Sequence, residues 1–130
     1  MSGPSGIIEG VAFELLDAGV TLATVYQDVP EDTQPPVVIL GDMSAEPFTD
    51  DPADPDRRVS LTITTVTAGE ERQPCTDVQD EVEAALGGAR VQRSGWDLAF
   101  RSLGSDATLT SEASGYVGTT TFEIIAFNMG

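Results

Sequence analysis

The densest group of residues that could do chemistry is a run of acidic side chains within residues 41–56. This segment reads GDMSAEPFTDDPADPD and places Asp50, Asp51, Asp54 and Asp56 close together. Carboxylate oxygens suit Ca²⁺, but the segment lacks the turn glycine and the distant bidentate glutamate of an EF-hand. Its prolines also stiffen the chain where ligands would have to converge. We therefore expect at most weak cation binding here and no dedicated metal site.

Other routes to catalysis are limited by residue types that the chain lacks. It contains no histidine and no lysine, and its single cysteine is Cys75. Without histidine there is no imidazole base or ligand, and one cysteine makes neither an internal disulfide nor a cysteine-rich zinc site. Paired carboxylates such as Glu70 with Glu71 precede a predicted helix, and those of the helix itself lie on its outer face. Because no nucleophile and base can be paired, we expect a protein that is not an enzyme and uses no cofactor.

The charge balance restricts the partners. The 130 residues include 22 Asp and Glu against six arginines, which gives a formal charge of −16. This field repels phosphate and anionic lipid headgroups, so DNA readers and membrane-surface proteins are excluded. No apolar run approaches the roughly 20 residues that cross a bilayer, and the MSGPSG start lacks the basic stretch of a signal peptide. We expect a protein made and used in a cytoplasm, or in an assembly built there.

The acidic residues are unevenly distributed along the chain. Residues 1–56 hold 12 carboxylates and no cation, whereas residues 57–130 hold 10 carboxylates and all six arginines. This asymmetry suggests one acidic face and one mixed face. Two origins of the acidic, lysine-free composition stay open, a GC-rich genome that encodes arginine in place of lysine and a halophilic host. At this length and with 40% hydrophobic residues, we expect one domain over residues 1–130 with a proper core.

Two helices are predicted from apolar residues at helical spacing. The first covers GIIEGVAFELLDAG, with Ser5 as its cap and Gly19 at its end. The second covers QPCTDVQDEVEAALGG, with Pro74 in the first turn, Cys75 on the apolar stripe and a double glycine as its stop. Thr76 with Gln79 could instead form a capping box and move that start by two residues.

The strands are predicted from short apolar runs and from alternation. They are a short extended piece in TLATVYQDV, the buried run VVIL, the alternating VSLTITTV, a hairpin VQRSGWDLAFRSL around Ser94 and Gly95, and YVGTTTFEIIAFN. In the last strand Phe122 and Ile124 face one side and Ile125 and Phe127 the other, so both faces need cover, the second one by another subunit. Residues 41–56 are expected to form a long loop.

These elements predict an α+β domain. Its sheet is mostly antiparallel, two helices pack on it, and the order is α-β-β-β-α-β-β with the long acidic loop between strands 2 and 3. The aromatic residues alternate along strands with few cations nearby, which favours core packing over a base-stacking surface.

The ordered features resemble the tail terminator or tail-completion proteins of long-tailed phages and their gene-transfer-agent relatives. The resemblance is carried by VYQDVPEDTQPPVVILGD, the acidic loop, RVSLTITTV, DVQDEVEAALGG and YVGTTTFEIIAF, and it covers residues 5–127. Two departures are an unusually acidic, proline-rich loop and a proline at the start of the second helix. Both departures affect the contacts expected of the loop more than they affect the expected fold.

The resemblance implies a virion protein that forms a homohexameric ring at the head-proximal end of the tail. Such a ring caps the tail tube, stops polymerisation of the major tail-tube protein and docks the neck or head–tail connector, while genome DNA passes through its lumen without specific binding. An acidic lumen suits this passage because it repels phosphate. The terminal strand and the loop can form a closing interface between subunits. The expected contact residues are Phe48, Asp50, Asp51, Asp54, Asp56, Arg57, Arg58, Ile125 and Phe127.

Two alternatives remain open. A neck or head-completion protein of the same virion would have a similar structural role but a different partner. An acidic DNA mimic that sequesters a basic protein would be a monomer or dimer with carboxylates spaced like phosphates, a regular spacing that the clustered loop acids do not supply.

Overall fold

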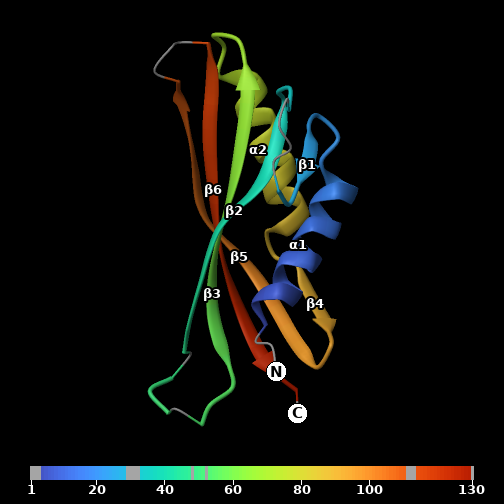
Figure 1. Ribbon diagram of the computed structural model, residues 1–130, viewed down its shortest axis with the longest axis vertical. Coiled ribbons are helices and arrows are strands. Elements are labelled where there is room, and N and C mark those ends of the chain that lie inside the picture. The colour runs from blue at the N-terminus through green and yellow to red at the C-terminus, as the bar shows by residue number, and fades with distance from the viewer. Residues whose placement is uncertain (1–3, 29–32, 48, 52, 111–113, 130) are drawn as a thin grey trace.

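The computed structural model describes residues 4–28, 33–47, 49–51, 53–110 and 114–129, which form two helices and one sheet (Figure 1). The elements are α1 (Ser5–Gly19), β1 (Thr24–Tyr26), β2 (Val37–Pro47), β3 (Arg57–Ala68), α2 (Gln73–Leu86), β4 (Arg90–Arg93), β5 (Trp96–Leu109) and β6 (Gly115–Asn128). The predicted α+β class is confirmed. The sheet has one strand more than the predicted order, because the hairpin around Ser94 and Gly95 contributes both β4 and β5 before β6.

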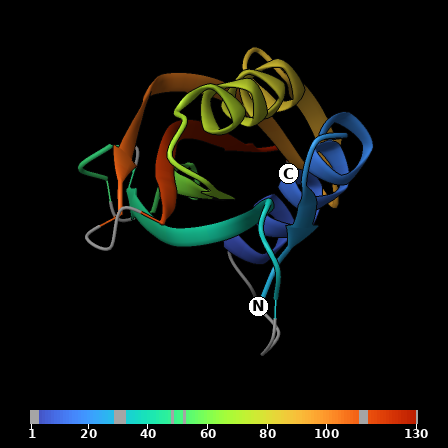
Figure 2. The same cartoon turned by 90° about the horizontal axis from the view of Figure 1, so that it is seen from above.

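The sheet is curled, with strand order β1-β2-β3-β6-β5-β4. All pairings are antiparallel except the short β1–β2 pair. Viewed along the long axis, the sheet curves around and both helices lie against its concave side (Figure 2). Ser94 and Gly95 both have positive φ, as the tight β4–β5 turn requires. No helix in the described part of the chain is long and apolar enough to span a bilayer.

Alternation along the two central strands places the core on the concave side. In β3 the odd-numbered residues from Val59 to Thr67 are buried, and in β6 the even-numbered residues from Tyr116 to Ala126 are buried. The predicted inward-facing residues are among them. Those with no exposed surface include Ile8, Leu16, Leu61, Ile63, Val82, Leu86, Leu98, Phe122 and Ile124. The opposite, convex face carries many hydroxyl side chains, including Ser60, Thr62, Thr64, Thr119 and Thr121.

The prediction of a loop over residues 41–56 is wrong in its first half. β2 continues to Pro47, and Met43 to Pro47 pair with Leu61 back to Arg57 after an irregularity that follows Leu40. Glycine, aspartate and proline argue against a strand locally, but the backbone pairing offered by β3 overrides this preference. The connection between β2 and β3 is thereby shortened to residues 48–56.

The helix boundaries differ from expectation mainly at the start of α1. Ser5 is already helical, Pro4 precedes it, and no side chain caps this end, so the predicted Ser5 cap is wrong. α2 begins at Gln73 with Pro74 in its first turn and ends before Gly87, as predicted. The alternative capping box is not formed, because the Gln79 amide instead donates to the Asp106 carbonyl oxygen at 2.6 Å.

A carboxylate of α2 secures the segment that leaves α1. Glu81 accepts hydrogen bonds from the backbone N–H groups of Thr21 and Leu22 at 3.0 and 2.9 Å, and from the Thr21 hydroxyl at 2.6 Å. These bonds lower the pKa of Glu81, the Thr21 hydroxyl contributing most. Glu81 therefore acts as a cap for a chain segment that is distant in sequence.

Candidate assembly surface

The acidic loop is shaped by hydrogen bonds to its own carboxylates. Asp51 Oδ1 accepts from the Ala53 N–H at 2.9 Å. Asp54 accepts from the Thr49 hydroxyl at 2.8 Å and from the Asp56 N–H at 2.9 Å. Aspartate is favoured in turns because its side chain can bond the backbone two residues further on. The loop acids therefore have a structural role in addition to their charge.

This bonding pattern also bears on metal binding. The backbone N–H of Asp56 is the largest cause of a lowered Asp54 pKa, followed by the Thr49 hydroxyl. The Arg57 guanidinium donates to the carbonyl oxygens of Asp54 and Asp56, both at 2.8 Å, so a cation already lies against the loop backbone. Among the residues that the structure describes, no group of three or more acidic or cysteine side chains is placed to hold a metal ion.

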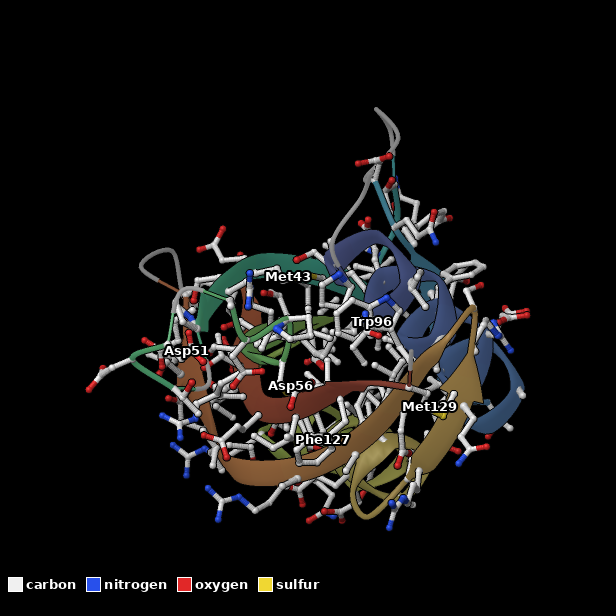
Figure 3. All side chains as sticks on the ribbon, turned by 90° about the horizontal axis from the view of Figure 1, so that it is seen from below. Met43, Asp51, Asp56, Trp96, Phe127 and Met129 are labelled. Atoms are coloured by element: carbon white, nitrogen blue, oxygen red, sulfur yellow. The ribbon has the colours of Figure 1, made fainter. Side chains whose placement is uncertain are left out.

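The end of the loop is joined to the end of the last strand. Asp56 Oδ1 accepts from the backbone N–H of Asn128 at 2.8 Å. In the β3–β6 ladder Arg57 lies opposite Ala126 and Arg58 opposite Ile125. Seen from this end of the molecule, Asp56 lies near the centre and Asp51 at the periphery (Figure 3). Contact residues predicted from two distant parts of the sequence thus lie on neighbouring strands.

A row of alternating charges crosses four strands of the convex face. Glu46 of β2 lies 3.6 Å from Arg58 of β3, which lies 3.7 Å from Glu123 of β6. Glu123 is also 2.9 Å from Arg101 of β5. Two acids and two bases thus form an ion-pair row with no net charge. Glu123 is the most buried of the four, with 21% of its side chain exposed, and it joins the two halves of the row.

Apolar side chains lie at the C-terminal end of the same region. Ile125 is half-buried and Phe127 is 39% exposed, both on the convex face, and Met129 beyond β6 is 51% exposed. Both helices cover the concave face, so the predicted division of β6 into two apolar sides is confirmed (Figure 2).

Phe48, also a predicted contact, lies outside the described residues. Asp50 and Asp51 are exposed on the loop.

Each of the six arginines has a partner within the chain. Besides the contacts of Arg57, Arg58 and Arg101, Arg90 binds Asp97 at 2.6 Å, Arg93 binds Glu14, and the Arg72 guanidinium lies 5.4 Å from the centre of the Tyr116 ring. The cations are therefore spread over several elements and engaged locally. This arrangement does not form the continuous basic stripe that phosphate backbones bind.

The sequence reasoning missed three members of the ion-pair row, Glu46, Glu123 and Arg101. Glu123 and Arg101 follow buried aromatic residues in alternating stretches of their strands, which is a signal for the face on which they lie, whereas Glu46 lies in a stretch without alternation. The missing information is register, because a shift by one residue would place these charges on the opposite face. The β2 extension that carries Glu46 was also assigned to the loop.

A separate hollow lies at the other end of the fold, beside the first turns of α2. Its volume is about 310 Å³, and it is lined mainly by apolar residues, namely Leu22, Pro35, Pro36, Ala68, Pro74 and Val78, together with Thr67 and Asp77. None of the predicted contact residues that the structure describes lines it.

Comparison with known proteins gives a likeness to a solved structure but none to a family model or a curated sequence. No protein-family model matches the chain, and no curated protein sequence matches it. Among solved structures, the fold is similar to that of a chain in a structure described as the virion of a native gene transfer agent (GTA) particle. The TM-score is 0.84 and the sequence identity 20%, and the match covers 97% of this chain and 98% of the other. At this identity, the likeness establishes a shared fold over nearly the whole length.

Proposed function

We propose that the protein is a structural component of a tailed, phage-like particle, in which it forms a ring that ends the tail tube and joins it to the neck. The observation that carries the proposal is the likeness to a GTA virion chain, because it spans both chains almost completely. A partial match would have indicated only a common supersecondary motif. That likeness supports a virion component, and the finer role, a ring at the end of the tail tube, rests on the sequence resemblance to tail terminators, which is carried by the order of motifs.

The surface formed by the acidic loop, the ion-pair row and Phe127 has the features of a protein–protein contact and not those of a catalytic site. The acidic loop, the ion-pair row and the exposed Phe127 lie on one end and one face of the sheet, and the helices occupy the other face. An exposed apolar group beside a structured polar loop is typical of a protein–protein contact. The contact residues proposed for the ring and its partners are those named from the sequence, with the ion-pair row added.

The test of this role is the ability of the purified protein to form rings and to stop tube growth. We expect negative-stain images and light scattering to show six-fold rings, and we expect added protein to shorten tubes formed by the major tail-tube protein. A monomer at every salt concentration, with and without tube protein, would contradict the proposal. Co-sedimentation with a portal or adaptor protein but not with tube protein would instead assign it to the neck.

The role of the loop is tested with a fourfold variant, Asp50→Asn, Asp51→Asn, Asp54→Asn and Asp56→Asn. Asparagine keeps an oxygen acceptor for the loop hydrogen bonds, so we expect the monomer to stay folded while association with the ring or tube changes. The matched control removes four exposed charges elsewhere, by Asp17→Asn, Glu70→Gln, Glu71→Gln and Asp80→Asn. Equal assembly of both variants would exclude a specific role for the loop.

A further inference from the structure

Part of each edge of the curled sheet has no neighbouring strand. β1 pairs with β2 only as far as Ile39, so residues 40–47 of β2 form one edge of the sheet. β4 pairs with β5 only from Trp96 to Ala99, and Phe100 exchanges backbone bonds with Ala89 and Gly88. Residues 101–109 of β5 therefore form the other edge. We call these two stretches the β2 open edge and the β5 open edge.

Both open edges are accessible along most of their length. In the β2 open edge every residue from Gly41 to Pro47 except Met43 is exposed, and in the β5 open edge only Ser102 and Ala107 are partly covered. Within the described residues, no backbone hydrogen bond joins the outer side of either stretch to another segment. The side chain of Gln79 reaches one β5 carbonyl, that of Asp106.

An open edge has a defined binding chemistry, because its unpaired N–H and C=O groups accept another extended backbone. Natural proteins protect such edges with charged residues (especially lysine), proline, β-bulges or a covering segment. Each open edge here contains one irregularity, between Leu40 and Met43 and between Ser102 and Gly104, and two charged side chains. This chain has no lysine, and the two open edges contain one proline, Pro47, where β2 ends. The β5 open edge contains no proline and carries two large apolar side chains, Leu103 at 51% and Leu109 at 42% exposure. The two exposed leucines beside unpaired backbone groups indicate a surface that is covered in the assembled state.

We propose that the β2 open edge of one copy pairs with the β5 open edge of a second copy. The two stretches are similar in length and lie on opposite edges of one sheet, so each contact leaves one open edge of each kind for the next copy. Such a head-to-tail contact generates a ring when its rotation closes. The inference rests on the ring-forming role proposed above and names the surfaces that close the ring.

Charge also favours pairing of unlike edges. The β2 open edge carries Asp42 and Glu46, and Glu46 is already paired with Arg58 of the same chain, so pairing two β2 edges would set the Asp42 carboxylates against each other. The β5 open edge carries one base, Arg101, which also contacts Glu123 of its own chain, and one acid, Asp106, so its two formal charges cancel and it repels a β2 edge less than a second β2 edge does. Because the two stretches lie at opposite ends of the long axis, a closed ring requires that this axis is tilted from the ring axis, since a repeated displacement along it would give an open helix (Figure 1).

Cysteine cross-linking tests this contact directly. Ser44→Cys lies on the β2 open edge and Thr108→Cys on the β5 open edge, and both positions are exposed on the convex face. The native Cys75 is fully buried, so the parent protein is the control for background reaction. The two single variants and the double variant are treated with a short bismaleimide at a concentration where rings are seen by negative stain. The products are then separated on a denaturing gel.

We expect the double variant to give a ladder that extends beyond the dimer, and we expect each single variant to stay monomeric on the gel. A dimer as the largest product of the double variant, or dimers from either single variant, would overturn the head-to-tail pairing. Rings seen by negative stain without any cross-linked ladder would overturn this inference and leave the ring proposal standing. Absence of both rings and ladders would overturn both proposals.

Discussion

Gly118 of β6 lies where α2 crosses the sheet, and the close approach there depends on the missing side chain. A Cβ at this position would lie 2.8 Å from the Gln79 Cδ and 2.9 Å from the Cys75 Sγ. Both atoms belong to the buried face of α2. The glycine therefore lets the helix sit directly on the strand and lets Gln79 reach the Asp106 carbonyl.

We predict that Gly118→Ala lowers the free energy of unfolding by about 1–3 kcal/mol, the usual cost of overpacking. The matched control is Gly10→Ala within α1, where a Cβ would meet nothing within 4 Å. That change should raise the free energy of unfolding by about 0.5–1 kcal/mol, because alanine is the better helix former. Urea unfolding of both variants measures the difference. Equal stability of Gly118→Ala and the parent would show that α2 shifts without cost.

The burial of a single residue could be predicted from the sequence where it depends only on residue type and on the spacing of apolar residues. The place of Cys75 on the buried stripe of α2 followed from helical spacing, and burial raises the pKa of its thiol. The ion-pair row from Glu46 to Arg101 was not predictable, because it depends on the register of four strands. The Asp56–Asn128 bond joins residues far apart in the sequence, so it too required the fold.

At the scale of elements, Glu81 determines how α1 and β1 are held against α2. Its carboxylate accepts three hydrogen bonds from Thr21 and Leu22, which lower its pKa. A carboxyl group with a lowered pKa in the folded state stabilises the fold above its unfolded pKa, about 4.3 for glutamate, and this contribution is lost as the pH falls through the folded value.

We therefore predict that Glu81→Gln lowers the thermal midpoint by a few degrees at pH 7, and that the gap between parent and variant closes as the pH falls below about 4. Differential scanning calorimetry from pH 7 to pH 3 measures that gap. Asp80→Asn is the matched control, because Asp80 is an exposed neighbour on the same helix and makes none of these bonds. A gap that is constant with pH would contradict a role for the charge.

Element prediction succeeded where local pattern and tertiary pairing agree. α2 and the alternating core of β3 were located from sequence because spacing, proline and glycine all favour the same assignment. β2 was cut short at Leu40 because residues 41–47 have poor strand propensity, and only the β3 partner makes them extended. The cap of α1 was misplaced because serine favours a cap in general, whereas here the helix begins one residue earlier, after Pro4.

At the scale of the whole molecule, charge is the dominant property. The formal charge is −16, and each arginine already contacts a partner within its own chain, which is a carboxylate for four of them, backbone carbonyls for Arg57 and the Tyr116 ring for Arg72. Copies that assemble must therefore overcome mutual repulsion with apolar burial and backbone pairing, because few cations are free to form intersubunit ion pairs. The same repulsion acts on DNA phosphate, which suits a passage through which a genome moves without binding.

Because repulsion between copies opposes apolar burial and backbone pairing, we predict that the fraction of protein in rings rises with salt concentration. The Debye length falls from about 10 Å at 0.1 M to about 3 Å at 1 M, so screening weakens repulsion between copies while backbone pairing and apolar contacts remain. Sedimentation velocity across this range should show the ring fraction rising with salt at fixed protein concentration. The control variant with four exposed charges removed, at Asp17, Glu70, Glu71 and Asp80, should reach the same ring fraction at lower salt. A ring fraction that falls with salt would instead indicate that attraction between unlike charges, such as Arg101 and the acids of the β2 open edge, holds the copies together.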